Sequence, residues 1–269
     1  MAKNTEETAV ALTIAGSDSG GGAGIQADLK TFTALDVFGT TAITCLTAQN
    51  PDEVRAVSPV DPAMVSQQIR TVCDAFKVGG IKTGMLYSAE IISAVANTLP
   101  ECTQAPLVVD PVMIATSGAK LLQDDAIQTM ITALFPLACV VTPNLPEAEL
   151  LTGNSIRNLA ELRAAAETIA AMTRGACLLK GGHLESGPEV SDILFCAGEL
   201  HEFRTVRIAA VDTHGTGCTY SAAIAAGLAK GQSLHTAAQQ AQQFVAQALK
   251  NALHTGRHRP LRLSTALLQ

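Results

Sequence analysis

Short apolar stretches that suit buried strands alternate along this chain with longer stretches of helical spacing, and this alternation limits the possible folds more than any other feature. Residues 10–15 and 41–46, for example, are strand-like and flank a helical stretch at 24–35. Strands separated by helices of about 10–15 residues indicate a parallel sheet covered by helices on both faces. Continuously apolar strands fit this arrangement, because both sides of such a sheet are buried.

The same pattern continues towards the C-terminus. Further strands are expected at residues 80–83, 107–110, 139–142 and 176–179, and further helices at 62–76, 88–99, 124–134, 159–172, 218–229 and 234–253. Residues 192–196 and 199–204, joined at Ala197-Gly198, predict a hairpin that adds antiparallel strands at one edge. Because no long linker or internal repeat divides the sequence, we expect a single domain over residues 1–269, with a polar N-terminal tail at 1–8 and a C-terminal tail at 255–269.

Composition argues against several classes of protein. The net charge of −6 disfavours nucleic acid as the main partner, and the basic residues Arg257, Arg259 and Arg262 fit a solvated tail better than a binding patch. Apolar runs stay below about 18 residues and the N-terminus lacks a signal region, so neither a membrane span nor secretion is expected. Seven cysteines, an odd number without a Cys-x-x-Cys pair, favour a reduced cytoplasmic protein.

The segment Asp212-Thr-His-Gly-Thr-Gly-Cys218 leads directly into a stretch of small residues that is typical of a helix. Backbone N–H groups of a glycine-rich turn, followed by a helix N-terminus, form a pocket for an anion. The same position lowers a thiol pKa from about 8.5 towards neutrality, so Cys218 could accept a proton. Covalent catalysis is disfavoured, because His214 has no evident group to orient it. A phosphate pocket beside a base predicts phosphoryl transfer; the alternative for Cys218 is an ordinary core thiol.

A second glycine loop, Gly16-Ser-Asp-Ser-Gly-Gly-Gly-Ala-Gly24, follows the first strand. Residues 22–27 satisfy the dinucleotide pattern G-x-G-x-x-A. The acidic residue that should bind a ribose is expected about 20 positions further on, and that neighbourhood has no acid before Asp52. The P-loop motif is missing from the sequence. A flexible loop is the alternative to a ligand-binding one. Asp28, one turn into the following helix, could accept hydrogen bonds from a ligand amine.

Asn144 and Glu147 follow another strand at a spacing that allows two interpretations. They could form a capping box at the start of a helix, or they could hold hydrated Mg²⁺. Ligands of parallel sheets collect at the carboxyl ends of the strands. Those ends carry the loop after Ala15, Gln49, Asp110, Asn144, Lys180 and the turn at Gly215.

Seven ordered segments resemble those of the hydroxymethylpyrimidine/phosphomethylpyrimidine kinases. They are residues 15–32, Leu46-Thr-Ala-Gln-Asn50, Lys82-Thr-Gly-Met-Leu86, Val109-Asp-Pro-Val-Met113, Thr142-Pro-Asn-Leu-Pro-Glu-Ala-Glu149, Leu179-Lys-Gly-Gly-His183 and Thr213-His-Gly-Thr-Gly-Cys218. The resemblance implies the ribokinase-like fold, a three-layer α/β/α sandwich, together with ATP, Mg²⁺ and a cytoplasmic homodimer. It also implies two successive phosphorylations in thiamine biosynthesis: of 4-amino-5-hydroxymethyl-2-methylpyrimidine, and then of its monophosphate to the diphosphate.

The resemblance further implies a role for each matching residue. Hydrogen bonds to the aminopyrimidine would come from Asp28 and Gln49, in a pocket lined by Gly16, Ala23, Met85 and Val112. The base would be Cys218, and the transferred phosphoryl group would be bound by the amides of Gly215, Thr216, Gly217 and Cys218. The nucleotide would face Asp110, Asn144, Lys180 and Thr213, and Mg²⁺ would be positioned through water by Asn144 and Glu147.

The chain departs from the family pattern at three places. Pro51-Asp-Glu-Val54 replaces Thr-x-Gly-Val, Thr116 replaces a Lys and Asp212 replaces an Asn. The first change could alter a loop over the substrate, and the second could remove one phosphate contact. A pyridoxal or pyridoxine kinase is the alternative function, although Gln49 with Asp28 favours the aminopyrimidine because pyridoxal has no ring amine to donate. A non-catalytic pyrimidine-binding protein is a third alternative, which would not need the Gly-Thr-Gly-Cys turn.

Overall fold

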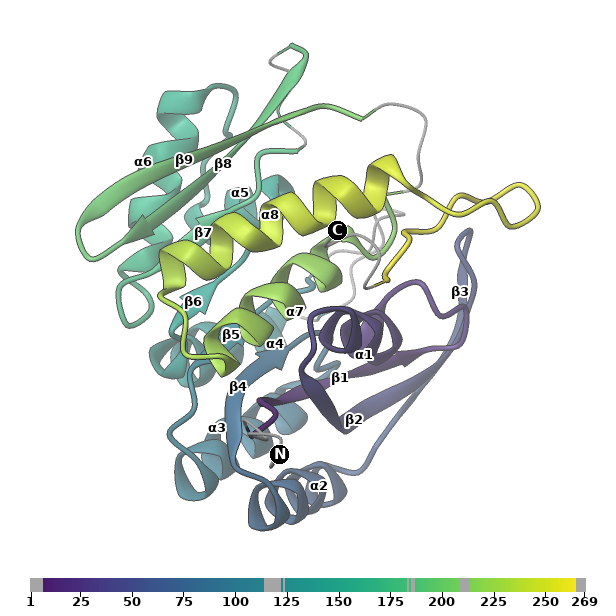
Figure 1. Ribbon diagram of the computed structural model, residues 1–269. Helices are drawn as coiled ribbons and strands as arrows, with labels where there is room; N and C mark the ends of the chain where they lie inside the picture. The colour runs from purple at the N-terminus through teal and green to yellow at the C-terminus, as the bar shows by residue number, and fades with distance from the viewer. Residues whose placement is uncertain are drawn as a thin grey trace, which may run out of the picture.

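The computed structural model describes residues 7–113, 122, 124–182, 184, 187–208 and 213–264. Over this part of the chain, nine strands form one sheet with helices on both faces, which gives three layers (Figure 1). The strands are β1 (Val10–Asp18), β2 (Phe38–Gln49), β3 (Val54–Pro59), β4 (Val78–Thr83), β5 (Leu107–Val109), β6 (Val140–Val141), β7 (Cys177–Leu179), β8 (Glu189–Cys196) and β9 (Glu199–Val206). The helices are α1 (Gly24–Ala34), α2 (Pro62–Ala75), α3 (Ala89–Cys102), α4 (Asp124–Thr129), α5 (Leu145–Thr152), α6 (Leu159–Ala170), α7 (Thr216–Ala229) and α8 (Leu234–Lys250).

The sheet has the order β3-β2-β1-β4-β5-β6-β7-β8-β9. Strands β2, β1, β4, β5, β6 and β7 run parallel, whereas β3 at one edge and the β8–β9 hairpin at the other are antiparallel. This confirms the predicted fold class, a mostly parallel sheet between helical layers with an antiparallel edge. Strand β3 was not expected, because its side chains are largely exposed and give little apolar signal.

Two clusters of buried side chains fill the spaces between the sheet and its helices. On one face, Ile69 of α2 packs in the same cluster as Ile14 of β1; on the other, Phe32 of α1 packs with the small residues of α7. A methyl group on Gly80 of β4 would lie 2.3 Å from the carbonyl oxygen of Ala225. Helix α7 therefore rests almost directly on the sheet, as expected from a chain rich in small apolar residues, and its N-terminus is carried to the pocket described below.

One expected helix differs in the structure. The helix predicted at 124–134 is α-helical only to Thr129 and continues as a π-helical turn over Met130–Leu134, followed by a 3₁₀ turn at Phe135–Leu137 that contains Pro136. Pro136 lacks the N–H needed to continue an α-helix, which accounts for its end at this point. None of the helices in the described part of the chain is both long and apolar enough to span a bilayer.

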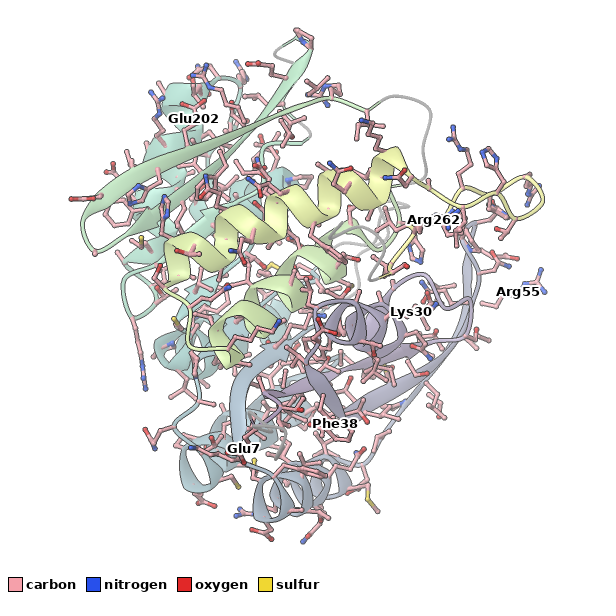
Figure 2. All side chains as sticks on the ribbon, in the orientation of Figure 1. Glu7, Lys30, Phe38, Arg55, Glu202 and Arg262 are labelled. Carbon is pink, nitrogen blue, oxygen red and sulfur yellow. The ribbon has the colours of Figure 1, made fainter. Side chains whose placement is uncertain are left out.

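The C-terminal segment folds back on the molecule instead of extending as a solvated tail (Figures 1 and 2). The N–H of Leu253 donates to the carbonyl of Pro260 at 2.8 Å, and Arg262 Nε donates to the carbonyl of Asn251 at 3.1 Å. Arg257 forms an ion pair with Asp52, in the turn between β2 and β3. The expected tail is thus wrong for residues 255–264, whose basic side chains are partly used in internal contacts.

Candidate active site

One cavity of about 680 Å³ lies at the carboxyl ends of the parallel strands. Strands β1, β2 and β4, the segment just after β5, the two glycine loops and the start of α7 all contribute to its wall. Fourteen of the fifteen residues expected in the site line this cavity: Gly16, Ala23, Gln49, Met85, Asp110, Val112, Asn144, Glu147, Lys180, Thr213, Gly215, Thr216, Gly217 and Cys218. The structure therefore brings most of the predicted residues together, although it changes the assignment of particular side chains.

The turn that starts α7 faces a lysine and a carboxylate. Gly215 adopts φ +84°, and the backbone N–H of Thr216 donates to the carbonyl of Thr213 at 3.1 Å. A methyl group on Gly217 would lie 3.2 Å from Lys180 Nζ and 3.7 Å from Asp110 Oδ2. Since the first amides of a helix have no intrahelical acceptor, they and Lys180 together form a cationic pocket for an anion. Lys180 donates to Asp110 Oδ1 at 3.1 Å, which holds its ammonium there.

The carboxylate of Asp18, which the sequence reasoning missed, fixes the other glycine loop. It accepts hydrogen bonds from the backbone N–H groups of Gly20, Gly22 and Ala23 at 2.8, 3.0 and 2.8 Å, and lies 3.3 Å from His214 Nε2. Burial acts to raise the pKa of Asp18, but the His214 and amide donors outweigh it and lower this pKa. A short acidic side chain at the end of a strand, directly before a glycine run, was the available signal.

Asn144 and Glu147 do form the capping box that was one of their two interpretations. Asn144 Oδ1 accepts from the N–H of Glu147, and Glu147 Oε2 accepts from the N–H of Asn144, both at 2.9 Å. Glu147 Oε1 also accepts from the N–H of Met113 at 3.1 Å. Both residues nevertheless line the cavity, and burial raises the pKa of Glu147 although the nearby Lys180 acts in the opposite direction. Capping and ligand binding are therefore compatible here.

Asp28 needs a correction, because its carboxylate is completely buried and does not line the cavity. Thr13 Oγ1 donates to Asp28 Oδ2 at 2.6 Å, and Lys82 Nζ donates to Oδ1 and Oδ2 at 3.0 and 2.9 Å. Because this carboxylate has no solvent exposure and stands behind the cavity wall, it does not face the space in which a substrate amine would lie. The cavity wall contains Lys82 instead, a residue without an assigned role in the sequence reasoning. A lysine within the otherwise apolar strand β4 was the signal for it.

Cys218 lines the cavity as expected, but its thiol is not activated in the way that its helix position indicated. Burial, together with the carboxylates of Asp28 and Asp110, raises the pKa of Cys218 to about 11, although Lys82 and the backbone amide of Gly24 act to lower it. The expected shift towards neutrality is therefore wrong for the protein without ligands. The helix N-terminus is outweighed because the sulfur is withdrawn from water and faces two carboxylates.

A further part of the cavity, between α8 and the β8–β9 hairpin, escaped the sequence reasoning. Asp192 accepts hydrogen bonds there from the N–H of Gly181 at 2.9 Å, the hydroxyl of Tyr220 at 3.2 Å and Nε2 of Gln242 at 3.4 Å. The rest of this wall is mainly apolar, with Val190, Val206, Ile208, Val245 and Leu249. Apolar walls with a few fixed polar groups are typical of small-molecule sites.

The turn between β2 and β3 covers another part of the opening. Asn50, Pro51, Asp52 and Glu53 line the cavity, and Asn50 Oδ1 accepts from the N–H of Asp52 and of Glu53 at 2.9 and 3.1 Å. The family departure at residues 51–54 therefore lies at the mouth of the site. The other two departures, Thr116 and Asp212, lie outside the described residues.

A family model described as phosphomethylpyrimidine kinase matches residues 18–261. The chain belongs to the phosphomethylpyrimidine kinase family. A hydroxymethylpyrimidine/phosphomethylpyrimidine kinase of Bacillus subtilis is 46% identical over 91% of both chains. A bifunctional thiamine biosynthesis protein of Geobacter sulfurreducens is 47% identical over 93% of this chain, which spans only 51% of that longer protein.

Solved structures show the same fold. An ADP complex of Bacillus subtilis pyridoxal kinase superposes with a TM-score of 0.89 at 36% identity, covering 98% of this chain and 100% of that one. A phosphomethylpyrimidine kinase from Clostridium difficile gives a TM-score of 0.80 at 39% identity, covering 89% and 99%. The family membership makes the protein a kinase of the thiamine pathway, and the ribokinase-like fold inferred from the sequence is confirmed.

Proposed function

We propose that the protein phosphorylates 4-amino-5-hydroxymethyl-2-methylpyrimidine with ATP, and then phosphorylates the monophosphate to the diphosphate. The observation that carries this proposal is the convergence of the Gly215–Cys218 turn, Lys180 and Asp110 in one cavity with Gln49. Family membership supports the reaction type. The amides of Gly217 and Cys218, which have no intrahelical acceptor, lie on a turn beside Lys180 and suit a migrating phosphoryl group, since catalysis of this transfer rests on positioning and electrostatic stabilisation.

The pyrimidine would occupy the part of the cavity lined by Gly16, Ala23, Gln49, Met85 and Val112. Gln49 is held through its backbone: its N–H donates to Ser19 Oγ at 2.8 Å, and Ser19 Oγ–H donates to its carbonyl at 2.7 Å. Thr47 Oγ1 donates to Gln49 Oε1 at 3.2 Å. The amide can therefore offer its NH₂ to a ring nitrogen, and its oxygen can accept a second hydrogen bond, from the ring amine.

The nucleotide would lie on the other side of the turn, where Asp110, Asn144, Lys180 and Thr213 line the cavity and an apolar wall follows between α8 and β8–β9. Mg²⁺ typically keeps several waters and is held by one or two carboxylates and substrate phosphates. Glu147 and Asn144 fit this pattern, because carboxylate and amide oxygens retain lone pairs for water beyond the capping hydrogen bonds. The bound ion would offset phosphate charge during transfer.

The chemical step needs a base for the alcohol, and Cys218 is our choice because its sulfur lines the cavity on the same turn as the amides. The alcohol O–H bond would break as the S–H bond forms, the alkoxide oxygen would bond to the γ-phosphorus, and the bond from that phosphorus to the ADP oxygen would break. Since the thiol is protonated in the protein without ligands, a nearby positive charge must favour the thiolate during turnover.

Pyridoxal kinase activity is the competing function, because structures at 34–36% identity are pyridoxal kinases, including a Staphylococcus aureus enzyme with AMP-PCP and pyridoxal. Product analysis by mass with the pyrimidine alcohol, its monophosphate and pyridoxal, each with ATP and Mg²⁺, separates the two. We expect products carrying one and two phosphates from the pyrimidine. A higher kcat/KM for pyridoxal than for the pyrimidine alcohol would overturn the proposal.

The expected homodimer and cytoplasmic location form part of the same proposal. All seven cysteines are free, which supports a reducing compartment. Light scattering during size-exclusion chromatography tests the dimer: a mass near twice 27.8 kDa is expected, and a mass of one chain would rule it out.

A further inference from the structure

The ammonium of Lys82 is buried at the wall of the active-site cavity. Its side chain has no solvent exposure, and both oxygens of the equally buried Asp28 accept from Nζ. A methyl group on Gly84 would lie only 2.8 Å from Nζ, so the missing side chain at Gly84 leaves room for the ammonium. An ammonium has three N–H donors. Two are directed to Asp28, which leaves a third for the cavity that Lys82 lines.

The orientation of the Lys82–Asp28 pair is fixed by residues of three elements. Lys82 belongs to β4, Asp28 to α1 and Thr13 to β1, and Thr13 Oγ1 donates to Asp28 at 2.6 Å. Burying an ion pair is expensive and often stabilises a fold less than well-packed apolar side chains of similar volume would. Stability alone therefore gives a weak reason for placing these charges below the cavity.

The charged groups near enough to act electrostatically on the Cys218 thiol come from four elements or their ends. They are Lys82 of β4, Asp28 of α1, Asp110 after β5 and Lys180 after β7. Lys180 is already bound to Asp110, and its position beside Gly217 suits the phosphates. Lys82, bound to Asp28, is the other cation of this set and lines the same cavity as Cys218.

We propose that Lys82 is a positioning residue for the reaction, whose positive charge, held in place by Asp28 and Thr13, stabilises the thiolate of Cys218 as it takes the proton of the substrate alcohol. This inference rests on the proposed function, in which Cys218 is the base. The thiol, protonated in the ligand-free protein, first gives its proton to water as the substrates bind. The alcohol proton then passes to the sulfur, so the protein returns to its protonated thiol when the products leave. Lys82 keeps its own proton throughout, so no further reactant is needed.

Replacing either member of the pair should change the pKa of the Cys218 thiol, and the two replacements should change it in opposite directions. Lys82→Met leaves the Asp28 carboxylate facing the sulfur without its counter-ion, which disfavours the thiolate. Asp28→Asn leaves the Lys82 ammonium without its carboxylate, which favours the thiolate. Both changes break a buried ion pair and destabilise the protein, so a role limited to structural support would change the thiol in the same direction in both variants.

The test is the rate of Cys218 alkylation by iodoacetamide at pH 8, followed by mass spectrometry of the peptide that carries Cys218. Because the thiolate is the reactive form, one unit of change in thiol pKa alters this rate about tenfold. We expect roughly tenfold slower alkylation in Lys82→Met and roughly tenfold faster alkylation in Asp28→Asn. Lys82→Arg, which keeps the charge, should stay closer to the wild-type rate.

Two controls accompany the measurement. Lys77→Met removes a lysine from the exposed segment just before β4 and should leave the rate unchanged. Cys45 has no solvent exposure and lies below the same cavity, so its alkylation in each sample reports any loosening of the fold. If the Cys218 rate moves in the same direction in Lys82→Met and Asp28→Asn, or stays at the wild-type value in both, the proposal is wrong. Failure of the wild-type protein to phosphorylate the pyrimidine would instead refute the proposed function. The alkylation rates of Cys218 could still be interpreted in that case, because they do not depend on turnover.

Discussion

A methyl group on Gly215 would lie 1.9 Å from the carbonyl oxygen of Gly22. The two glycine turns of the site therefore touch backbone to backbone, although they lie far apart in the sequence. A methyl group on Gly22 would in turn lie 2.9 Å from His214 Cδ2. The shape of the anion pocket thus depends on the close packing of two loops that lack side chains at the point of contact.

Gly215→Ala should damage catalysis more than it damages the fold. The backbone at φ +84° is strained for alanine, and the clash with Gly22 must push the turn away from its position. Because loss of one aligned donor to a developing charge costs about 10²–10³ in kcat, we expect a fall of at least about 100-fold. Steady-state kinetics and Tm give the two readouts.

Gly231→Ala is the matched control for this change. Gly231 has a similar φ of +77°, but a side chain there meets nothing within 4 Å. It should lower stability by about 1 kcal/mol through the backbone alone and leave kcat near the wild-type value. Equal kinetic losses in the two variants would show that contact between the loops does not matter.

Asp18→Asn tests the carboxylate that organises the glycine loop. Asn keeps one acceptor oxygen, but its NH₂ group would point at the backbone N–H of Gly22 or Ala23. Asp18 Oδ2 now accepts a hydrogen bond from each of these N–H groups. We expect about 1–3 kcal/mol of destabilisation and a higher KM for the pyrimidine. Asp36→Asn is the control, since Asp36 is exposed at φ 54°, a conformation that Asn tolerates. Urea unfolding and KM measurements of both variants decide; an unchanged KM in Asp18→Asn would refute the role.

Much of the fold and the location of the site could be predicted because the signals are local. Alternating strands and helices indicate a parallel sheet, and polar residues at strand ends such as Gln49, Asp110 and Lys180 must then share one edge. The structure brings these residues into one cavity. The capping interpretation of Asn144 and Glu147 was also within reach, since it depends on a spacing of three residues.

The remaining features depend on three-dimensional environment. Asp28 was read as a ligand group because a sequence does not show that Lys82 and Thr13 occupy its oxygens. The thiol of Cys218 was read as acidic because the helix N-terminus is visible in the sequence, whereas burial and the facing carboxylates are not. The role of Asp192 was missed because the side chains that donate to it, Tyr220 and Gln242, are distant in the sequence.

Glu202 on β9 should make stability depend on acid pH (Figure 2). Hydrogen bonds from Arg204, Ser191 and Arg163 outweigh burial and lower the pKa of Glu202 to about 2. Because the folded pKa lies below the unfolded value of about 4.3, this stabilisation is complete above about pH 5 and is lost as pH falls towards 2. Glu202→Gln should therefore cost about 1–2 kcal/mol at pH 7, after allowance for solvent screening, and only a small part of that near pH 2.

Urea unfolding at a series of pH values measures this difference. Glu199→Gln on the same strand is the control, because its side chain is 75% exposed and should give a small, nearly pH-independent effect. A Glu202→Gln penalty that persists at pH 2 would mean that packing, not charge, accounts for it.

Glu147→Gln separates helix capping from metal positioning. Gln can keep one acceptor for the N–H of Asn144 or Met113, but it removes the charge at the cavity wall. We expect a higher Mg²⁺ concentration for half-maximal rate, by about tenfold, because a neutral amide is a weaker partner for hydrated Mg²⁺ than a carboxylate.

Glu161→Gln is a matched capping change: Glu161 lies at the start of α6, where Asn158 caps the helix and Glu161 Oε2 accepts from the N–H of Arg157. Each substitution should lower stability by about 0.5–2 kcal/mol. If the Mg²⁺ requirement rises equally in both variants, Glu147 acts only as a cap; if it rises only in Glu147→Gln, the charge of Glu147 serves the metal as well as the helix.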